Sequence, residues 1–168
     1  MKAWLKVAVA LFASIGSYAF AGPGVNKEAT LRQALGPAAE ALLQPKRVQV
    51  GELAIVSVAE TRQYALKGTD RLAGYPIAKQ LSALDGTTSQ QLANMLLDEH
   101  NYVDVRQRCK NDTLRGIRFQ NAHIVEVTIG GPCNQVVAAY REGKTVKWWG
   151  GVLSPAASEK VTAILRQR

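Results

Sequence analysis

The C-terminal half of the chain alternates between apolar and polar positions with the period of a β-strand. In one segment Val103, Val105 and Cys109 fall on one face, whereas the residues between them are mostly charged. Turn-forming residues such as Asn111-Asp112 separate this segment from later ones. Together these patterns predict an antiparallel meander of about five strands, at residues 102–110, 115–120, 124–129, 135–140 and 144–149.

The N-terminal half mixes helical and strand patterns. Residues 28–35 and 38–43 are rich in good helix formers, and the Gly-Pro between them predicts two short helices or one bent helix. Residues 48–58 carry Val and Ala on alternate positions and predict a strand, and residues 61–66 predict a second one. Residues 75–84 are ambiguous, because their Ile and Leu spacing suits a helix whereas the opening Tyr-Pro suits an extended chain. For this segment we favour the helix.

Two further helices have clear start signals. Thr88 can cap a helix, and Gln91 three residues later completes a capping box. Ser154 is a favoured capping residue, and Pro155 suits the first helical position. The expected buried positions are Leu92, Met95, Leu96 and Leu97 in the first helix and Ala157, Val161, Ile164 and Leu165 in the second. Helices packed on an antiparallel sheet make the predicted fold class α+β, with a C-terminal helix and one or more N-terminal helices.

The first 21 residues have the parts of a cleavable secretory signal. Two lysines supply positive charge, residues 7–15 form an apolar run, and Ala19-Phe20-Ala21 matches a cleavage site. The apolar run is too short for a permanent membrane helix. We therefore expect cleavage after this site, a periplasmic or secreted protein without a transmembrane anchor, and one mature domain at 22–168 with a flexible start at 22–27.

The charge of the mature chain favours anionic partners. The full sequence has 21 Lys and Arg and 13 Asp and Glu, and two of the cations lie in the signal. The mature chain thus keeps 19 cations against 13 acids, a net charge of +6. In an exported protein such a charge favours another, acidic exported protein or an anionic envelope polymer, and we expect no nucleic acid. The alternative is that the basic surface contacts only solvent and has no specific partner.

The two cysteines, Cys109 and Cys133, predict a disulfide. Both lie in the mature part, and an even count in an oxidising compartment is typical of a bridge. The bond would close a loop of about 25 residues and contribute on the order of 3 kcal/mol through chain entropy. In the expected meander both cysteines lie at one edge of the sheet if Gly130-Gly131 lets the chain fold back. A redox pair is disfavoured because the C-x-x-C spacing is lacking.

Candidates for catalysis are few. His100 at a helix end and His123 in a hairpin turn have no partner at a spacing that defines a site, so we expect both at the surface. Asp98 and Glu99 are adjacent, and neighbouring helical residues point about 100° apart, so they are poor candidates for a glycosidase pair. The usual metal, phosphate and nucleophile motifs do not occur in the sequence. The sequence therefore favours a protein that is not an enzyme, with no catalytic residue, metal or cofactor predicted.

Trp148-Trp149, followed by two glycines, is the most unusual local pattern of the mature chain. In a strand the two rings point to opposite faces, so one can fill the core while the other lies near the surface and contacts a partner. Arg106, Arg108 and Lys110 form a basic stripe on the first strand of the expected meander, which would favour an acidic partner. The alternative for the tryptophans is that both rings pack inside the protein. The alternative for the basic stripe is a charged face that contacts only solvent. These five residues are the candidate binding surface.

The segment from Leu92 to the end also carries an ordered set of short motifs. They are L-L-D at 96–98, Tyr102, R-x-C ending at Cys109, R-F at 118–119, V-x-V at 125–127 and Cys133 after Gly-Pro. This order resembles small exported bacterial proteins of uncharacterised families, although Gly130 stands where that pattern has an earlier cysteine. The resemblance implies an exported α+β domain with one disulfide, and it implies no activity.

Three functions are compatible with these observations. The first is a non-enzymatic binding protein, for example an inhibitor or immunity-type partner of another exported protein. The second is a hydrolase that acts on a cell-envelope polymer through carboxylates that the sequence alone does not pair. The third is a structural accessory protein of the envelope. The binding protein is the favoured hypothesis.

Overall fold

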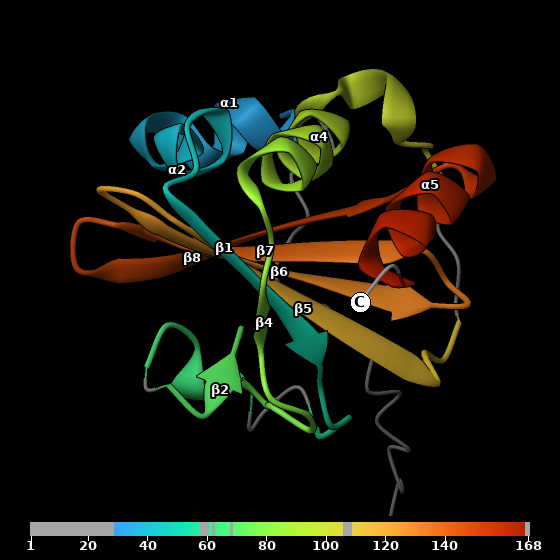
Figure 1. The fold of residues 1–168 in the computed structure, drawn as a ribbon, viewed down its shortest axis with the longest axis horizontal. Helices are drawn as coiled ribbons and strands as arrows, with labels where there is room; N and C mark the ends of the chain where they lie inside the picture. Colours follow the sequence, from blue (N-terminus) through green and yellow to red (C-terminus); the bar gives the residue numbers. More distant parts are fainter. Residues whose placement is uncertain (1–28, 58–60, 62, 68, 106–108, 167–168) are drawn as a thin grey trace, which may run out of the picture.

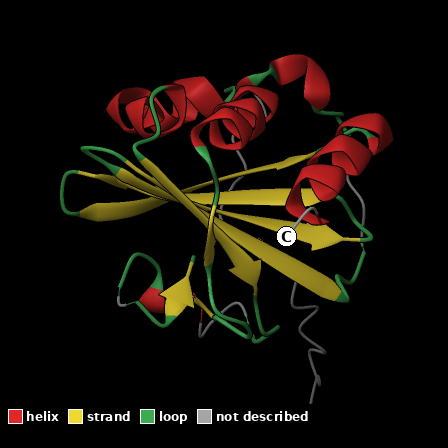
Figure 2. Ribbon diagram, in the orientation of Figure 1, coloured by secondary structure: helices red, strands yellow, loops and turns green. Residues whose placement is uncertain are grey.

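The computed structural model describes residues 29–57, 61, 63–67, 69–105 and 109–166. Its centre is a six-stranded sheet with helices on one face (Figure 1, Figure 2). The strand order is β4-β1-β5-β6-β7-β8, and all neighbours are antiparallel. The predicted α+β class is confirmed. The predicted signal peptide at 1–21 and the flexible start at 22–27 lie outside the described residues.

The sheet consists of a meander and two added strands. The strands are β1 (Arg47–Glu52), β4 (Ser82–Ala83), β5 (Thr113–Gln120), β6 (Ile124–Gly131), β7 (Gln135–Glu142) and β8 (Thr145–Val152), and a separate pair is β2 (Arg71–Leu72) with β3 (Tyr75–Pro76). The helices are α1 (Leu31–Leu35), η1 (Gly36–Ala39), α2 (Glu40–Leu43), α4 (Gly86–Leu97), η2 (Glu99–Asn101) and α5 (Pro155–Arg166). Short turns join β5 to β8 in sequence order, so these four strands are the meander, and β1 and β4 extend it.

The N-terminal helices form one bent element, which is one of the two arrangements that the sequence left open. Thr30 begins α1 with a capping box: its hydroxyl accepts from the Gln33 N–H at 3.3 Å, and the Gln33 side chain accepts from the Thr30 N–H at 3.0 Å. Gly36 has a φ of 51° and starts the 3₁₀ turn η1. The chain then continues directly into α2.

The main core lies between the sheet and the helices. Alternate residues of the strands point toward the helices, which follows from the twofold period of a strand. The central strands supply Val48, Ile117, Phe119, Val125 and Val127, each at most 1 % exposed. The helices supply Leu31, Leu35, Leu42, Leu92, Leu96, Val161 and Leu165. Burial of this apolar area is the main stabilising contribution to the fold.

A smaller core lies on the opposite face, under a segment that we call the flap (residues 61, 63–67 and 69–81). Its buried members are Leu53, Ala65, Leu72, Ala73, Leu114 and Ala139. Gly116 of β5 lies beneath the flap, where an added Cβ would come within 2.8 Å of the side chains of Leu53 and Leu72. In the flap itself Gly74 has a φ of 82°, and a Cβ there would overlap the Thr61 carbonyl. The flap thus packs closely on the sheet because Gly116 and Gly74 lack the Cβ atoms that would collide with their neighbours.

Three expectations for this region are wrong. Residues 61, 63 and 64 are helical rather than extended, and the strand expected at 48–58 ends at Glu52. Residues 75–84 are not a helix but contain the short strands β3 and β4. The physical reason is pairing with the sheet: β4 pairs with β1, and Ile77 forms an isolated bridge with Leu53. These tertiary contacts outweigh a weak helical spacing.

The first strand of the expected meander is also wrong. Tyr102 forms an isolated bridge with Leu153, and the Val103 N–H donates to the Val152 carbonyl at 2.9 Å. The following described residues, 103–105 and 109–110, belong to no strand, and residues 106–108 lie outside the described part. Val105 is 44 % exposed, so its alternation does not mark a buried face. The chain instead travels from β8 toward β5, which begins at the far side of the meander.

The two later helices form where the sequence places them, with one correction. Asp85 rather than Thr88 caps α4, because the Asp85 carboxylate accepts from the Thr88 N–H at 2.8 Å. In α5 the Ser154 hydroxyl accepts from the Ala157 N–H at 3.3 Å, which confirms the predicted cap. The expected apolar positions of α5 are all buried. In α4 Leu92 and Leu96 are buried, and Met95 and Leu97 pack partly buried against the core.

The predicted disulfide between Cys109 and Cys133 is present, with 5.7 Å between the Cα atoms. Cys133 is fully buried, whereas Cys109 is exposed. The bond ties the segment before β5 to the turn between β6 and β7. Beside the bond, the Asp112 N–H donates to the Gly131 carbonyl at 2.9 Å and Asn111 Nδ2 donates to Gln135 Oε1 at 3.2 Å, so the same stretch is tied to the sheet by three contacts.

Among the described residues, no helix is both long and apolar enough to cross a membrane.

Replacing Cys109 by serine tests the stabilising role of the bridge. Because Cys109 is exposed, Cys109→Ser adds no buried hydroxyl, and its main effect is the loss of the crosslink. We expect the free energy of unfolding in urea to fall by on the order of 3 kcal/mol under oxidising conditions. Wild-type protein with reductant should unfold at nearly the same urea concentration as the variant. Equal unfolding midpoints of oxidised wild type and Cys109→Ser would contradict the assigned role.

Candidate functional site

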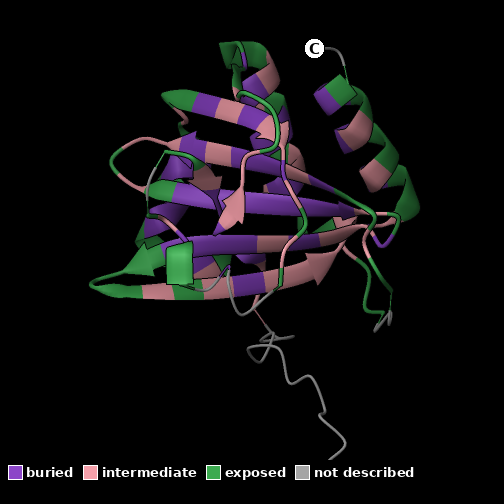
Figure 3. Cartoon of the chain, turned by 90° about the horizontal axis from the view of Figure 1, so that it is seen from below, coloured by how far each residue is buried: buried purple, intermediate pink, exposed green. Residues whose placement is uncertain are grey.

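An open groove lies on the face of the sheet that the helices do not cover. It has a volume of about 850 Å³, and its floor consists of Arg47, Gln49, Arg118, Gln120, Ile124 and Glu126 from β1, β5 and β6. Its walls are Leu66, Thr69, Asp70 and residues 77–81 of the flap. Figure 3 views the molecule from this side. The groove therefore combines a floor built on regular strands with walls from a segment rich in loops.

The strand register orders the floor into two rows of side chains. In the first row Arg47 is paired with Gln120, which is paired in turn with Ile124. In the second row Gln49 is paired with Arg118, which is paired with Glu126. Directly opposite residues of antiparallel strands have Cβ atoms roughly 5 Å apart, so each row is continuous across three strands. The floor thus presents charged and amide groups at fixed spacing.

The deepest polar contact of the groove is an ion pair between Arg118 and Glu126. The Glu126 side chain is 2 % exposed and the Arg118 side chain 11 %. One carboxylate oxygen of Glu126 accepts from Arg118 Nε at 2.9 Å and from Nη2 at 2.7 Å. This two-point contact suits the planar guanidinium and is stronger than a hydrogen bond between neutral groups.

The same pair fastens the flap to the sheet. The second carboxylate oxygen of Glu126 accepts from the backbone N–H of Ala73 at 2.6 Å and of Leu66 at 3.2 Å. Arg118 Nη2 donates to the Arg71 carbonyl at 2.5 Å. Leu66 and Ala73 have φ angles of 57° and 47°, a region that side chains disfavour by about 1 kcal/mol each. Glu126 therefore holds the flap by two strained backbone positions and is surrounded by donors.

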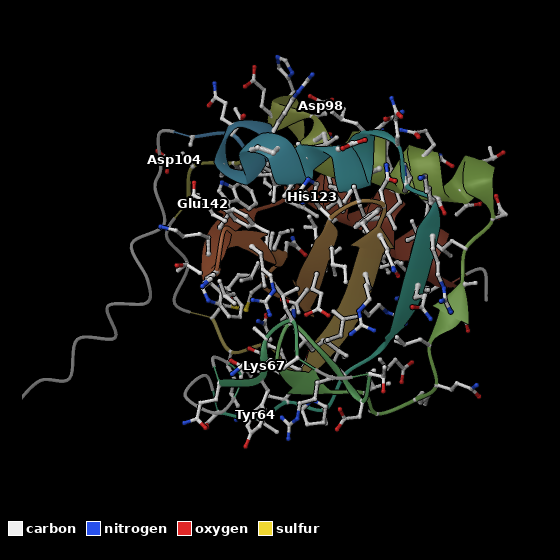
Figure 4. The ribbon with its side chains drawn as sticks, turned by 90° about the vertical axis from the view of Figure 1, so that its left-hand side faces the viewer. Tyr64, Lys67, Asp98, Asp104, His123 and Glu142 are labelled. Atoms are coloured by element: carbon white, nitrogen blue, oxygen red, sulfur yellow. A yellow bond between two sulfur atoms is a disulfide. The ribbon has the colours of Figure 1, made fainter. Side chains whose placement is uncertain are left out.

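The flap has its own internal contact on the outer side. The Arg71 guanidinium lies 4.2 Å from the centre of the Tyr64 ring, and its Nη1 donates to the Gly74 carbonyl at 3.0 Å. In Figure 4 Tyr64 and Lys67 lie at the end of the molecule opposite Asp98. These contacts stabilise the flap as a unit above the ion pair.

The charged groups at the mouth of the groove are Arg47 on the floor and Asp70 and Lys79 on the wall. Arg47 is exposed, and its neighbours Gln49 and Gln120 are half-buried amides. On the wall Lys79 donates to Glu52 at 2.7 Å, and this hydrogen bond lowers the pKa of the Glu52 carboxyl. Since Arg118 is bound to Glu126, Arg47 is the cation of the floor that faces the solvent. The arrangement can hold an anionic group beside two amides.

The two tryptophans lie on opposite faces of β8. Trp149 is 7 % exposed and belongs to the main core; its Nε1 donates to the Ala29 carbonyl at 3.0 Å. Its ring meets Tyr102 edge to face, with 5.2 Å between centroids. Trp148 is half-buried and packs against the smaller core. Trp149 is therefore placed inside the protein rather than on the candidate binding surface, because the helices cover its face of the sheet.

Of the predicted basic stripe, the structure describes only Lys110. Lys110 is exposed and belongs to no regular element, and Arg106 and Arg108 lie outside the described residues. The expected meander placed Lys110 on the face of its first strand, and the structure does not. The binding role of these residues stays a prediction.

The titratable residues near the helices are placed as surface groups. His100 Nδ1 lies 2.9 Å from Asp98 Oδ1 at the end of α4, and this hydrogen bond lowers the pKa of Asp98. His100 is exposed and His123 is half-buried in the turn between β5 and β6. Figure 4 shows Asp98 and His123 apart from each other. In the described part of the chain, no three His, Cys, Asp or Glu side chains gather as a metal site would require.

Sequence reasoning missed the groove, although one signal was present. Glu126 stands alone among apolar residues in a strand that the pattern assigns to the core, and Arg118 lies on the neighbouring strand at the same side. A charge in a buried strand needs a partner, so this spacing indicates an ion pair. The walls could not be found in this way, because the expectations for the flap were wrong.

Comparison with known proteins adds no relative: no family model, no curated protein and no solved structure matches this chain.

Replacing Glu126 by glutamine tests how far the fold depends on the ion pair. Glu126→Gln keeps the shape of the side chain but leaves Arg118 without its counter-charge in a buried place. We expect the free energy of unfolding to fall by on the order of 3 kcal/mol, measured by urea denaturation. The matched control is Glu159→Gln on the exposed side of α5, for which no measurable change is expected. Equal stabilities of the two variants would show that the pair contributes little.

Proposed function

We propose that this protein is an exported, non-enzymatic binding protein whose groove takes an anionic group. The ligand would be an acidic region of another exported protein or an anionic envelope polymer. The observation that carries the proposal is the floor of the groove, where Arg47 is exposed beside Gln49 and Gln120 while the one deep carboxylate is already bound. A guanidinium flanked by amide groups suits an anion and has no evident role in packing.

Export is supported by the disulfide together with the N-terminal sequence. A bridge between Cys109 and Cys133 persists in oxidising compartments and is rare in the cytosol. The N-terminal residues carry the pattern of a secretory signal. The two observations are independent, and both favour a periplasmic or secreted protein.

The hydrolase alternative is less well supported by the geometry. Glycoside hydrolysis needs two carboxyl groups that face the same bond. The groove holds Glu126 and Asp70, but Glu126 is bound by Arg118 and by two backbone N–H groups. Both oxygens of the Glu126 carboxylate already accept hydrogen bonds from the protein, so the group is not free to face a substrate. Binding therefore fits the groove better than catalysis.

A charge reversal at Arg47 tests the proposed ligand class. The probe is fluorescein-labelled polyglutamate, and its dissociation constant is measured by fluorescence anisotropy at physiological salt. We expect Arg47→Glu to raise the dissociation constant by about fivefold or more, because one close charge contact is worth roughly 1 kcal/mol. Lys160→Glu, on the exposed side of α5, makes the same change in net charge and should have little effect.

Two outcomes would overturn the proposal. If both variants weaken binding equally, polyglutamate responds to net charge and not to the groove. If neither variant changes binding, the groove is not the anion site.

A further inference from the structure

β8 (Thr145–Val152) is the last strand of the six-stranded sheet, so one of its two sides faces away from β7. It is eight residues long, whereas the strand at the other edge, β4, has two. A long free edge offers a row of backbone donors and acceptors to another extended chain. This edge is a candidate interaction surface that is separate from the groove.

The hydrogen bonds at the end of β8 show which residues point outward. The Leu153 N–H donates to Asn134 on the β7 side, whereas the Val152 carbonyl accepts from Val103 on the outer side. Backbone groups of successive residues alternate between the two sides of an antiparallel strand. Val146, Trp148 and Gly150 therefore direct their N–H and C=O groups outward, and no other described residue forms a hydrogen bond with these groups.

At the C-terminal end of β8, the chain at Tyr102 and Val103 already occupies the outer edge. Tyr102 forms the bridge with Leu153, and its hydroxyl donates to the Leu96 carbonyl at 2.7 Å. The Tyr102 ring also contacts Trp149, and burial raises the pKa of the Tyr102 hydroxyl. The crossing chain is therefore firmly attached there. An added strand is limited to the stretch from Thr145 to Gly151.

The side chains around the edge select for acidic partners. Arg141, Lys144 and Lys147 are exposed at or near the hairpin, where Glu142 lies 3.4 Å from Lys147. Glu142 lies at the outer side of the molecule in Figure 4. A partner strand that carries Glu or Asp opposite Lys147 would gain cross-strand attraction. A second copy of this chain would instead bring Lys147 near its own counterpart, which is destabilising.

The half-buried Trp148 adds an apolar contact on the face of the sheet opposite Lys147. It is paired with Ala139 of β7, and its ring packs partly against the smaller core. The remaining part of the ring is available to a side chain of an added strand. Aromatic residues next to a β-edge are favoured cross-strand partners.

We propose that β8 binds an extended, acidic segment of another exported protein by strand addition, which continues the sheet in antiparallel fashion. The three outward residues offer three N–H and three C=O groups, which give affinity without regard to sequence. Lys147 and Trp148 give selectivity for acidic and apolar side chains on opposite faces of the added strand. The proposal relies on the proposed function only for the exported compartment.

Amide hydrogen exchange, followed by NMR on the mature chain 22–168, tests this surface. The probe is an octapeptide of alternating glutamate and threonine, and the matched control peptide alternates lysine and threonine. On saturation with the acidic peptide, the amides of Val146, Trp148 and Gly150 should exchange at least about tenfold more slowly, since each gains a hydrogen bond worth roughly 1.4 kcal/mol. At the same concentration the lysine peptide, which Lys147 repels, should protect these amides far less.

Variants separate the backbone from the side-chain contribution. Val146→Pro removes an outward N–H without touching the bonds to β7, as proline is tolerated at such edge positions. It should raise the dissociation constant of the acidic peptide by about tenfold, whereas Val146→Ala, which keeps the N–H, should not. Lys147→Glu should also weaken binding, and Lys160→Glu should not.

Four results would overturn the strand-addition proposal. The acidic peptide could fail to bind, or it could protect the amides of Arg47 and Gln120 instead of those of β8. The edge amides could already exchange slowly in the free monomer, or their protection could grow with protein concentration in the absence of peptide. The second result would leave the proposed groove function intact. If Arg47→Glu does not weaken polyglutamate binding but the acidic peptide still protects β8, the strand-addition proposal stands. The two proposals therefore fail separately.

Discussion

The buried pair of Arg118 and Glu126 is the contact on which the open side of the molecule depends. The helix side of the sheet is held by a large apolar core and needs no polar fastening. The flap side has only a small apolar cluster, and two of its backbone positions are strained. Glu126 binds the N–H groups at both strained positions. The ion pair therefore supplies the ordering that apolar packing provides elsewhere.

This difference between the two faces also determines where binding can occur. The helices cover one face of the sheet (Figure 2), and Trp149 packs beneath them in the main core. On the other face the flap covers the centre of the sheet and leaves the end near Arg47 open. β8 is the last strand of the sheet, and no described strand pairs with its outer edge. The groove and the free edge thus exist because the helices and the flap cover only parts of the sheet.

The sequence predicted those elements whose signals are local and failed where distant contacts decide. Strand alternation gave β5 to β8, and the Ser154 and Pro155 cap gave α5, because each depends on neighbouring residues. Residues 75–84 were misassigned because pairing with β1 outweighs their own spacing. Val103 and Val105 alternate with charges but reach no core. Of the candidate site, the sequence held the clue of Glu126 but not the flap that it binds.

On the open face of the sheet, the central claim is that Glu126 keeps the flap bound. Native-state hydrogen exchange of the Ala73 and Leu66 amides tests this claim most directly, because both N–H groups donate to that carboxylate. We predict that both amides open only with a free energy close to that of global unfolding, like those of the central strand β6. Exchange of both amides as fast as in an unprotected loop, with β6 still protected, would contradict this role of Glu126.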